Sequence, residues 1–194
     1  LERLRAERER AVPRTFTVWH QNSGIDAIDL VRPGVPGHAG RYHRVGGTRT
    51  WYGSSSEDAA WAEFFRHYAE KDIDPFEVIR RIGTVRFEGL LALDLTDAEI
   101  RDALGLTEGD LVADDYAICQ RLADLARRAG FEAILAPSAG LHGAATLAIF
   151  GDGVSRRRAA VDDRGRQQPP IRMRKRLAMI RRAADVAESR VRDG

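Results

Sequence analysis

Residues 50–68 combine features of a strand, a turn and a helix in one short stretch, and they constrain the fold more than any other part of the chain. The β-branched and aromatic run at 50–52 favours a strand, and Gly53 ends it. Serines 54–56 offer an N-cap, and the acidic Glu57 and Asp58 suit the first turn of a helix. We therefore expect a strand that leads directly into a helix, as in an α+β protein.

A glutamate, Glu63, lies within this predicted helix among alanine and phenylalanine residues of core spacing. Two interpretations are open at this stage. Glu63 could point to solvent on the polar side of the helix, together with Arg66 and Lys71. Alternatively, it could face a cleft as a stabilising or acid/base carboxylate.

The chain resembles the RES domain family, bacterial proteins named for an Arg, a Glu and a Ser. The resemblance lies in the residue spacing around Glu63 and in the segments that follow it. Arg41 lies eleven positions before Tyr52, which lies eleven before Glu63. Further segments agree with the family in order and spacing, over roughly residues 15 to 150: 91–96, 103–106, 114–116, 119–120 and 134–138. The resemblance implies a toxin of a toxin–antitoxin pair, built like an ADP-ribosyltransferase.

This resemblance also implies a reaction, cleavage of NAD between nicotinamide and ribose, with inorganic phosphate, water or a protein as acceptor. Such a step passes through an oxocarbenium-like state, which a carboxylate stabilises, and Glu63 is the residue assigned to it. An arginine provides a planar fork for the diphosphate, so Arg41 takes that role. The remaining assignments are Arg49 or Arg44 in reserve for the diphosphate, Tyr52 as a flat face or ribose contact, and Ser138 as a hydrogen-bonding group at the same end of the ligand.

The sequence departs from the family at His20, where an arginine is usual after the first strand. If that arginine holds a phosphate, His20 could do so only as a weaker or pH-dependent donor, or it is a surface histidine. His142 in the loop after Ser138 is a further candidate, although an exposed loop position is its simpler interpretation. Asp114 and Asp115 suit the N-terminus of the next helix.

Several other classes of site find no support in the sequence. The five histidines are scattered, and the single cysteine, Cys119, is expected to be a core residue, so no metal site is predicted. Neither a Walker-type loop nor a Rossmann glycine motif is present. The sequence has no apolar run of membrane-spanning length and does not open with a signal-peptide pattern, so a cytoplasmic location is expected.

Outside the 50–68 stretch, periodicity predicts the remaining elements of an α+β fold, with six or more strands in a small, twisted, mixed sheet pair that encloses a cleft. Thr96 and Glu99 predict a capping box for a helix that ends at Gly105. The expected strands lie at 15–19, 78–87, 90–95, 131–137 and 145–150, and a second long helix at 116–129.

The predicted organisation is an N-terminal helical extension over residues 1–14, a catalytic domain over 15–154 and a basic C-terminal segment over 155–194. From Ser155 onward there are 13 Arg or Lys against 5 Asp or Glu, although the whole chain carries only +2. Residues 155–170 are interpreted as a linker, and an amphipathic helix is expected after Pro170. That helix could dock on the domain, pair with a second copy, meet a partner or touch nucleic acid.

The function predicted from the sequence is therefore a growth-arresting toxin that cleaves NAD by phosphorolysis or hydrolysis. The resemblance implies an Xre-type DNA-binding antitoxin, with a hetero-oligomer or a homo-oligomer as the assembly. One alternative is a mono-ADP-ribosyltransferase with a specific protein target. Another is a nucleic-acid-binding protein that acts through its basic tail.

Overall fold

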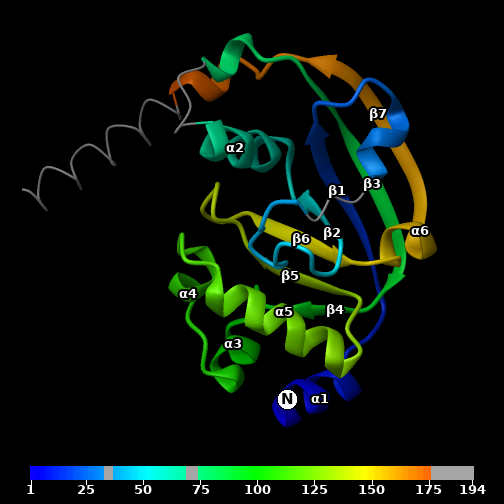
Figure 1. Ribbon diagram of the computed structural model, residues 1–194, viewed down its shortest axis with the longest axis vertical. Helices are drawn as coiled ribbons and strands as arrows, with labels where there is room; N and C mark the ends of the chain where they lie inside the picture. Colours follow the sequence, from blue (N-terminus) through cyan, green and yellow to red (C-terminus); the bar gives the residue numbers. More distant parts are fainter. Residues whose placement is uncertain (33–36, 69–73, 176–194) are drawn as a thin grey trace, which may run out of the picture.

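The computed structural model describes residues 1–32, 37–68 and 74–175 and consists of a mixed sheet flanked by helices (Figure 1). Seven strands form one sheet in the order β4-β5-β6-β2-β1-β3-β7. Neighbouring strands are antiparallel except β4 and β5, which are parallel. The strands are β1 (Arg14–Asn22), β2 (Thr50–Ser54), β3 (Arg80–Leu90), β4 (Ala92–Asp94), β5 (Ala133–Pro137), β6 (Ala145–Phe150) and β7 (Arg158–Gln167). The predicted α+β class is confirmed.

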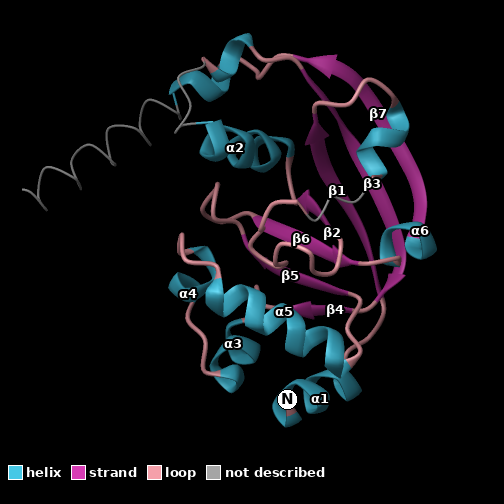
Figure 2. Ribbon diagram, in the orientation of Figure 1, coloured by secondary structure: helices cyan, strands magenta, loops and turns pink. Residues whose placement is uncertain are grey.

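The sheet is almost divided between β1 and β2. These strands share one residue pair, Trp19 with Ser54, whereas β1 pairs with β3 along nearly its whole length. Figure 2 shows that β1, β3 and β7 run in a different direction from β4, β5 and β6. The expected pair of sheets is thus a single sheet with a narrow junction.

Helices cover the two parts of the sheet separately. They are α1 (Glu2–Arg10), α2 (Glu57–Tyr68), α3 (Ala98–Leu104), α4 (Glu108–Val112), α5 (Ala117–Ala129) and α6 (Gly153–Arg157), with 3-10 turns η1 (Ala27–Val31) and η2 (Pro75–Glu77). Helices α1, α3, α4 and α5 gather beside the β4–β6 part, where Leu4, Leu122 and Cys119 are buried in one apolar core. Helix α2 packs on a separate core around Trp61, Phe64 and Ile82.

Local signals explain where the helices begin and end, with one correction. Ser56 accepts a hydrogen bond from the Ala59 amide and so caps α2, and Gly130 ends α5 at a φ of 91°, which favours glycine. The predicted capping box of Thr96 at α3 is wrong. Asp97 is the N-cap there, because its carboxylate accepts from the backbone of residues 99 and 100.

The predicted linker over residues 155–170 is also wrong. Residues 153–157 form α6, and 158–167 form β7, which pairs antiparallel with β3 at the edge of the sheet. Almost all of β7 is exposed, so it lacks the apolar alternation by which a strand is recognised. Residues 172–175 are helical, and the rest of the expected C-terminal helix lies outside the described residues.

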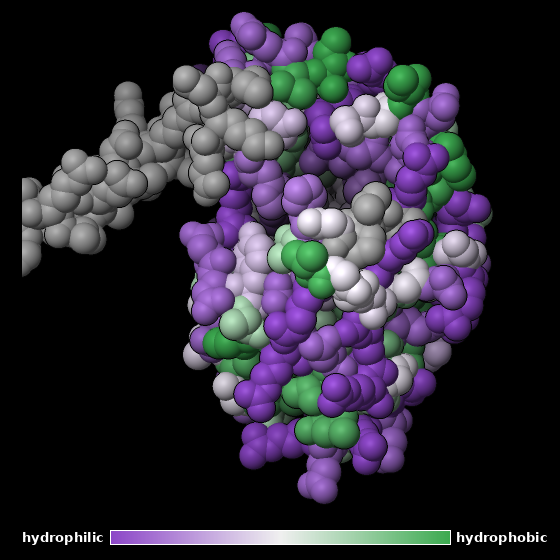
Figure 3. Space-filling view, in the orientation of Figure 1, coloured by the Kyte–Doolittle hydropathy of each residue, from purple (hydrophilic) through white to green (hydrophobic). Residues whose placement is uncertain are grey.

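The surface is mainly polar on the face shown in Figure 3, where apolar side chains form separate small groups. Among the described residues, the helices are too short or too polar to cross a membrane.

Candidate active site

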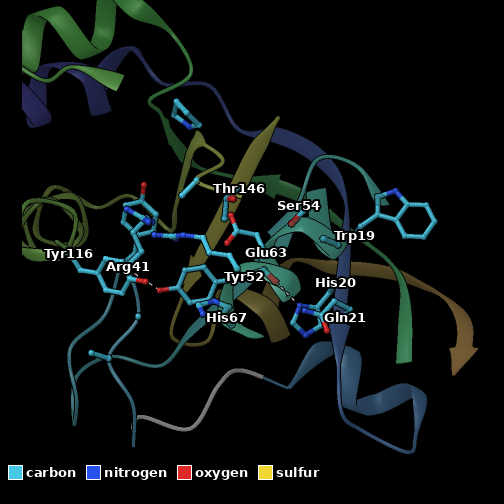
Figure 4. Close-up of a pocket in the computed structure, with 17 residues that line it drawn as sticks. Trp19, His20, Gln21, Arg41, Tyr52, Ser54, Glu63, His67, Tyr116 and Thr146 are labelled. Atoms are coloured by element: carbon cyan, nitrogen blue, oxygen red, sulfur yellow. Dashed lines mark hydrogen bonds between the residues drawn. The ribbon is translucent and has the colours of Figure 1, made fainter. Parts of the chain in front are cut away.

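A pocket of about 200 Å³ opens where β1 and β2 diverge. Its wall comes from segments far apart in sequence: β1, the 39–42 loop, β2, α2, the start of α5 and the loop after β5. In Figure 4 the side chains of Arg41, Tyr52 and Thr146 lie around Glu63, whereas the Trp19 ring points away from it. The lining includes Trp19, His20, Gln21, Arg41, Tyr52, Ser54, Glu63, Arg66, His67, Tyr116 and Thr146.

Glu63 faces this pocket rather than open solvent, in agreement with the cleft interpretation. One of its carboxylate oxygens, Oε1, accepts hydrogen bonds from the Ser138 hydroxyl and the Gly140 amide, both at 3.0 Å. Two donors fix the orientation of the carboxylate and leave Oε2 for a ligand.

Ser138 does not line the pocket but donates a hydrogen bond to Glu63. The residue is 5% exposed, and its hydroxyl oxygen accepts from the amides of Gly140 and Leu141, each at 3.2 Å. Since its proton is directed to Glu63, Ser138 is placed to position the carboxylate and not to contact a ligand.

Tyr52 presents its ring to the pocket, but its hydroxyl is committed elsewhere. The Nε2 of His43 lies 3.0 Å from the His38 carbonyl and must donate to it, so in the neutral ring Nδ1 accepts from the Tyr52 hydroxyl at 2.8 Å. Burial lowers the pKa of His43, which favours that neutral ring. The Tyr52 oxygen also accepts from the Tyr42 amide at 3.0 Å, and burial raises the pKa of Tyr52. Tyr52 therefore contributes a flat aromatic face.

Arg41 also lines the pocket, where it holds the C-terminal end of α4. Its guanidinium donates to the carbonyls of residues 111, 112 and 113 at 2.8, 3.5 and 2.6 Å, and it lies 4.8 Å from the centre of the Tyr116 ring. Three of its five N–H groups are thereby occupied, and the guanidinium also interacts with the Cys119 side chain. Arg41 thus has fewer free donors than sequence reasoning assumed for a diphosphate fork.

His20 connects the two strands at the junction of the sheet. Its Nδ1 lies 2.7 Å from the Tyr52 carbonyl, and its ring centre lies 4.9 Å from that of Trp51. Burial lowers the pKa of His20 to about 4, against the opposing effect of the bond to Tyr52. The neutral ring must carry its proton on Nδ1 to make that bond, so Nε2 is an acceptor. This state does not suit the phosphate donor considered from the sequence.

The other sequence candidates lie away from the pocket wall. Arg49 is exposed, and Arg44 is directed to Asp124 and Gln120 on α5. The His142 side chain is 96% exposed, as its simpler interpretation predicted. Asp115 accepts from the Ala117 amide at the start of α5, although the N-cap of that helix is Tyr116, which makes no side-chain cap.

Sequence reasoning missed several lining residues. Arg66 follows Glu63 by one helical turn, so its position on the same helix face was the available signal. Thr146 pairs with Ser54 in the sheet, and its hydroxyl is buried without a hydrogen-bond partner among the described residues. Such a group is a ready donor or acceptor for a ligand. No group of three or more metal-ligating side chains was found in the described part of the chain.

Comparisons with known proteins agree with this architecture. A model of the RES domain matches residues 10–171. The probable NAD(+) phosphorylase Rv3189 of Mycobacterium tuberculosis is 43% identical over 168 residues, which cover 85% of this chain and 78% of that protein. The NAD(+) phosphorylase MbcT of Mycobacterium bovis is 34% identical over 64 residues, 33% of this chain and 34% of that protein. The crystal structure of the M. tuberculosis MbcT–MbcA toxin–antitoxin complex shares the fold, with a TM-score of 0.70, 21% identity, and coverage of 91% of this chain and 97% of that chain.

Proposed function

This chain belongs to the RES domain family, and from that premise we propose that it is a toxin that cleaves the bond between nicotinamide and ribose in NAD. The relatives named above as NAD(+) phosphorylases support this reaction, with inorganic phosphate as the preferred acceptor. The single observation that carries the proposal is the Glu63 carboxylate, fixed by two hydrogen bonds and facing a pocket lined by aromatic rings and arginines.

Glu63 would act on the ribose. When the C–N bond breaks, its electron pair leaves with nicotinamide, which departs as a neutral ring, and positive charge develops on the ribose. A carboxylate held in place before the reaction stabilises that charge without reorganising. A phosphate oxygen then forms the new C–O bond, giving ADP-ribose 1″-phosphate, or water gives ADP-ribose.

Aromatic side chains would hold the flat nicotinamide ring. The Tyr52 ring faces the pocket, and its hydroxyl is hydrogen-bonded to the Tyr42 amide and the His43 ring. The orientation of the Tyr52 ring is therefore fixed. Tyr116 lines the same space. Stacking on a preset ring suits a planar heterocycle.

Arg41 would serve the ligand in two ways. It holds the C-terminal end of α4 at residues 111–113, and its remaining donor capacity can reach a phosphate oxygen. Arg41 can therefore donate fewer hydrogen bonds to a phosphate than a guanidinium without other partners could. Ser138 has a positioning role through Glu63.

Toxin activity of this kind requires a neutralising partner, and we propose a cognate antitoxin. The solved structure with the same fold is a toxin–antitoxin complex, which supports a partner of this kind. The antitoxin is proposed to be of the Xre DNA-binding type, and to close the pocket around Glu63.

The test is incubation of the purified chain with NAD, with and without inorganic phosphate, with products identified by mass. Release of nicotinamide with ADP-ribose 1″-phosphate is expected, and ADP-ribose alone would identify water as acceptor. ADP-ribose attached to a protein would instead indicate a transferase. Intact NAD under all of these conditions would contradict the proposal.

A further inference from the structure

Arg66 is the pocket arginine whose role the reaction above leaves open. It lines the pocket from α2, one helical turn after Glu63, where side chains on the same face have Cβ atoms about 5–6 Å apart. Its side chain is 23% exposed. A guanidinium withdrawn this far from water needs an anionic or hydrogen-bonding partner.

The carboxylate of Asp114 supplies that partner in the structure. Asp114 lies in the loop between α4 and α5 and pairs with Arg66 through Nη2, yet its own side chain is 93% exposed. An ion pair with so exposed a carboxylate contributes little stability, because water competes for the charge. Asp114 is therefore an anion that a better anion can replace.

Arg41 differs from Arg66 in this respect. Its partners are the backbone carbonyls of residues 111–113 at the C-terminal end of α4, which cannot leave without moving that helix. His20 is neutral and presents an acceptor. Of the two arginines that line the pocket, Arg66 is thus the one held by an exchangeable anion.

We propose that Arg66 is the principal anion-binding side chain of the pocket, that it binds a phosphate group, and that Asp114 occupies it until that group arrives. A planar guanidinium offers two parallel N–H donors to phosphate oxygens. The phosphate group belongs either to the diphosphate of NAD or to inorganic phosphate as acceptor. In both cases it is held one helical turn from Glu63.

This inference rests on the proposed function, so the experiment separates the two. The KM for NAD at saturating phosphate and the KM for phosphate at saturating NAD are measured for the wild type, Arg66→Ala, Asp114→Asn and a control, Arg86→Ala. Arg86 is also an ion-paired arginine, bound to Glu88 on β3, and it does not line the pocket. Circular dichroism checks the fold of each variant.

Arg66→Ala is expected to raise at least one of the two KM values about tenfold, with a smaller change in kcat, as loss of a charge-assisted pair predicts. A rise for phosphate alone assigns the acceptor, a rise for NAD alone assigns the diphosphate, and a rise for both assigns a shared position. Asp114→Asn is expected to lower the affected KM, because it removes the competing carboxylate. Arg86→Ala should leave both values unchanged.

Both KM values within twofold of wild type in Arg66→Ala would overturn the proposal, and so would an unchanged KM in Asp114→Asn. Should Arg66→Ala fail to fold, the exposed Asp114→Asn variant decides alone. If the wild type cleaves no NAD, calorimetric titration with ADP-ribose and with inorganic phosphate replaces the KM values. Weaker binding in Arg66→Ala would then support the anion role while the NAD reaction itself fails, and equal binding would overturn both.

Discussion

At the scale of single residues, the site depends on one carboxylate and the groups that hold it. Glu63 accepts two hydrogen bonds on the same oxygen. These bonds fix the side-chain rotamer and therefore the direction of the second oxygen. Removing the negative charge and loosening its support should therefore have different sizes of effect.

Glu63→Gln is expected to lower kcat by about 10²–10³, because a neutral amide cannot stabilise the developing charge on ribose. Ser138→Ala should lower it by about 10–100-fold, the range that corresponds to one hydrogen bond to a charged group. Steady-state NAD consumption measures both, with Ser155→Ala on α6 as a control that should match wild type. Equal kcat in wild type and Glu63→Gln would remove this residue from the reaction.

His20 makes folding stability depend on pH. Its pKa is lowered from 6.5 to about 4 in the folded chain, so between these pH values the unfolded chain binds a proton that the folded chain does not. The contribution of His20 to the free energy of unfolding is therefore fully present above pH 6.5. As the pH drops toward 4, the free energy of unfolding falls by at most about 3 kcal/mol. Denaturant titrations of wild type and His20→Asn at pH 7 and pH 4.5 test this. The stability advantage of the wild type should shrink at the lower pH, and a constant difference would contradict it.

At the scale of elements, the loop after β5 and helix α2 meet at very close range. A Cβ atom placed on Gly140 would lie 2.8 Å from the Glu63 backbone nitrogen and 3.1 Å from its Cδ. Glycine is thus required for the loop to bring its amide to the carboxylate.

Gly140→Ala is expected to push the loop from α2, with a loss of roughly 1–3 kcal/mol in the free energy of unfolding and a lower kcat. Gly109→Ala is the matched control, since its Cβ would meet no atom nearer than 3.6 Å. Thermal unfolding and NAD consumption report the two effects. A Gly140→Ala protein with wild-type kcat would show that this contact is not needed.

The elements differ in how far they could be predicted. The strand–turn–helix of residues 50–68 carries its own signals, a β-branched run and a serine cap, and it forms as expected, except that Gly53 does not end the strand, which continues to Ser54. β7 could not be found in this way, because an exposed edge strand needs no apolar face and gains its order from the backbone of β3. Thr146 reaches the site through the pairing of β6 with β2, which local spacing does not report, whereas Arg66 could have been found from its spacing of one helical turn after Glu63.

At the scale of the whole molecule, the chain returns from the far edge of the sheet to the helix that carries Glu63. After β7, Arg172 pairs with Glu57 and Asp58 in the first turn of α2, at 3.3 and 3.0 Å, and Met173 is buried in the core beneath that helix. Residues beyond the predicted 15–154 domain therefore help to hold α2.

Met173→Ala is expected to cost about 2 kcal/mol in the free energy of unfolding, because it leaves a cavity in the α2 core. Ile171→Ala, at a position 80% exposed, should change it by less than about 0.5 kcal/mol. Denaturant unfolding of both variants measures the difference. Equal stabilities would mean that the segment after β7 contributes nothing to the core around α2.

The junction between β1 and β2 has a consequence for ligand binding. The two strands share one pair, Trp19 with Ser54, and the His20 side chain makes a further connection to the Tyr52 carbonyl. The two parts of the sheet are thus joined by very little strand pairing, and the pocket lies where further pairing between β1 and β2 would be. A ligand that contacts both strands would replace the missing contacts between them. Ligand binding would then make the whole sheet more rigid.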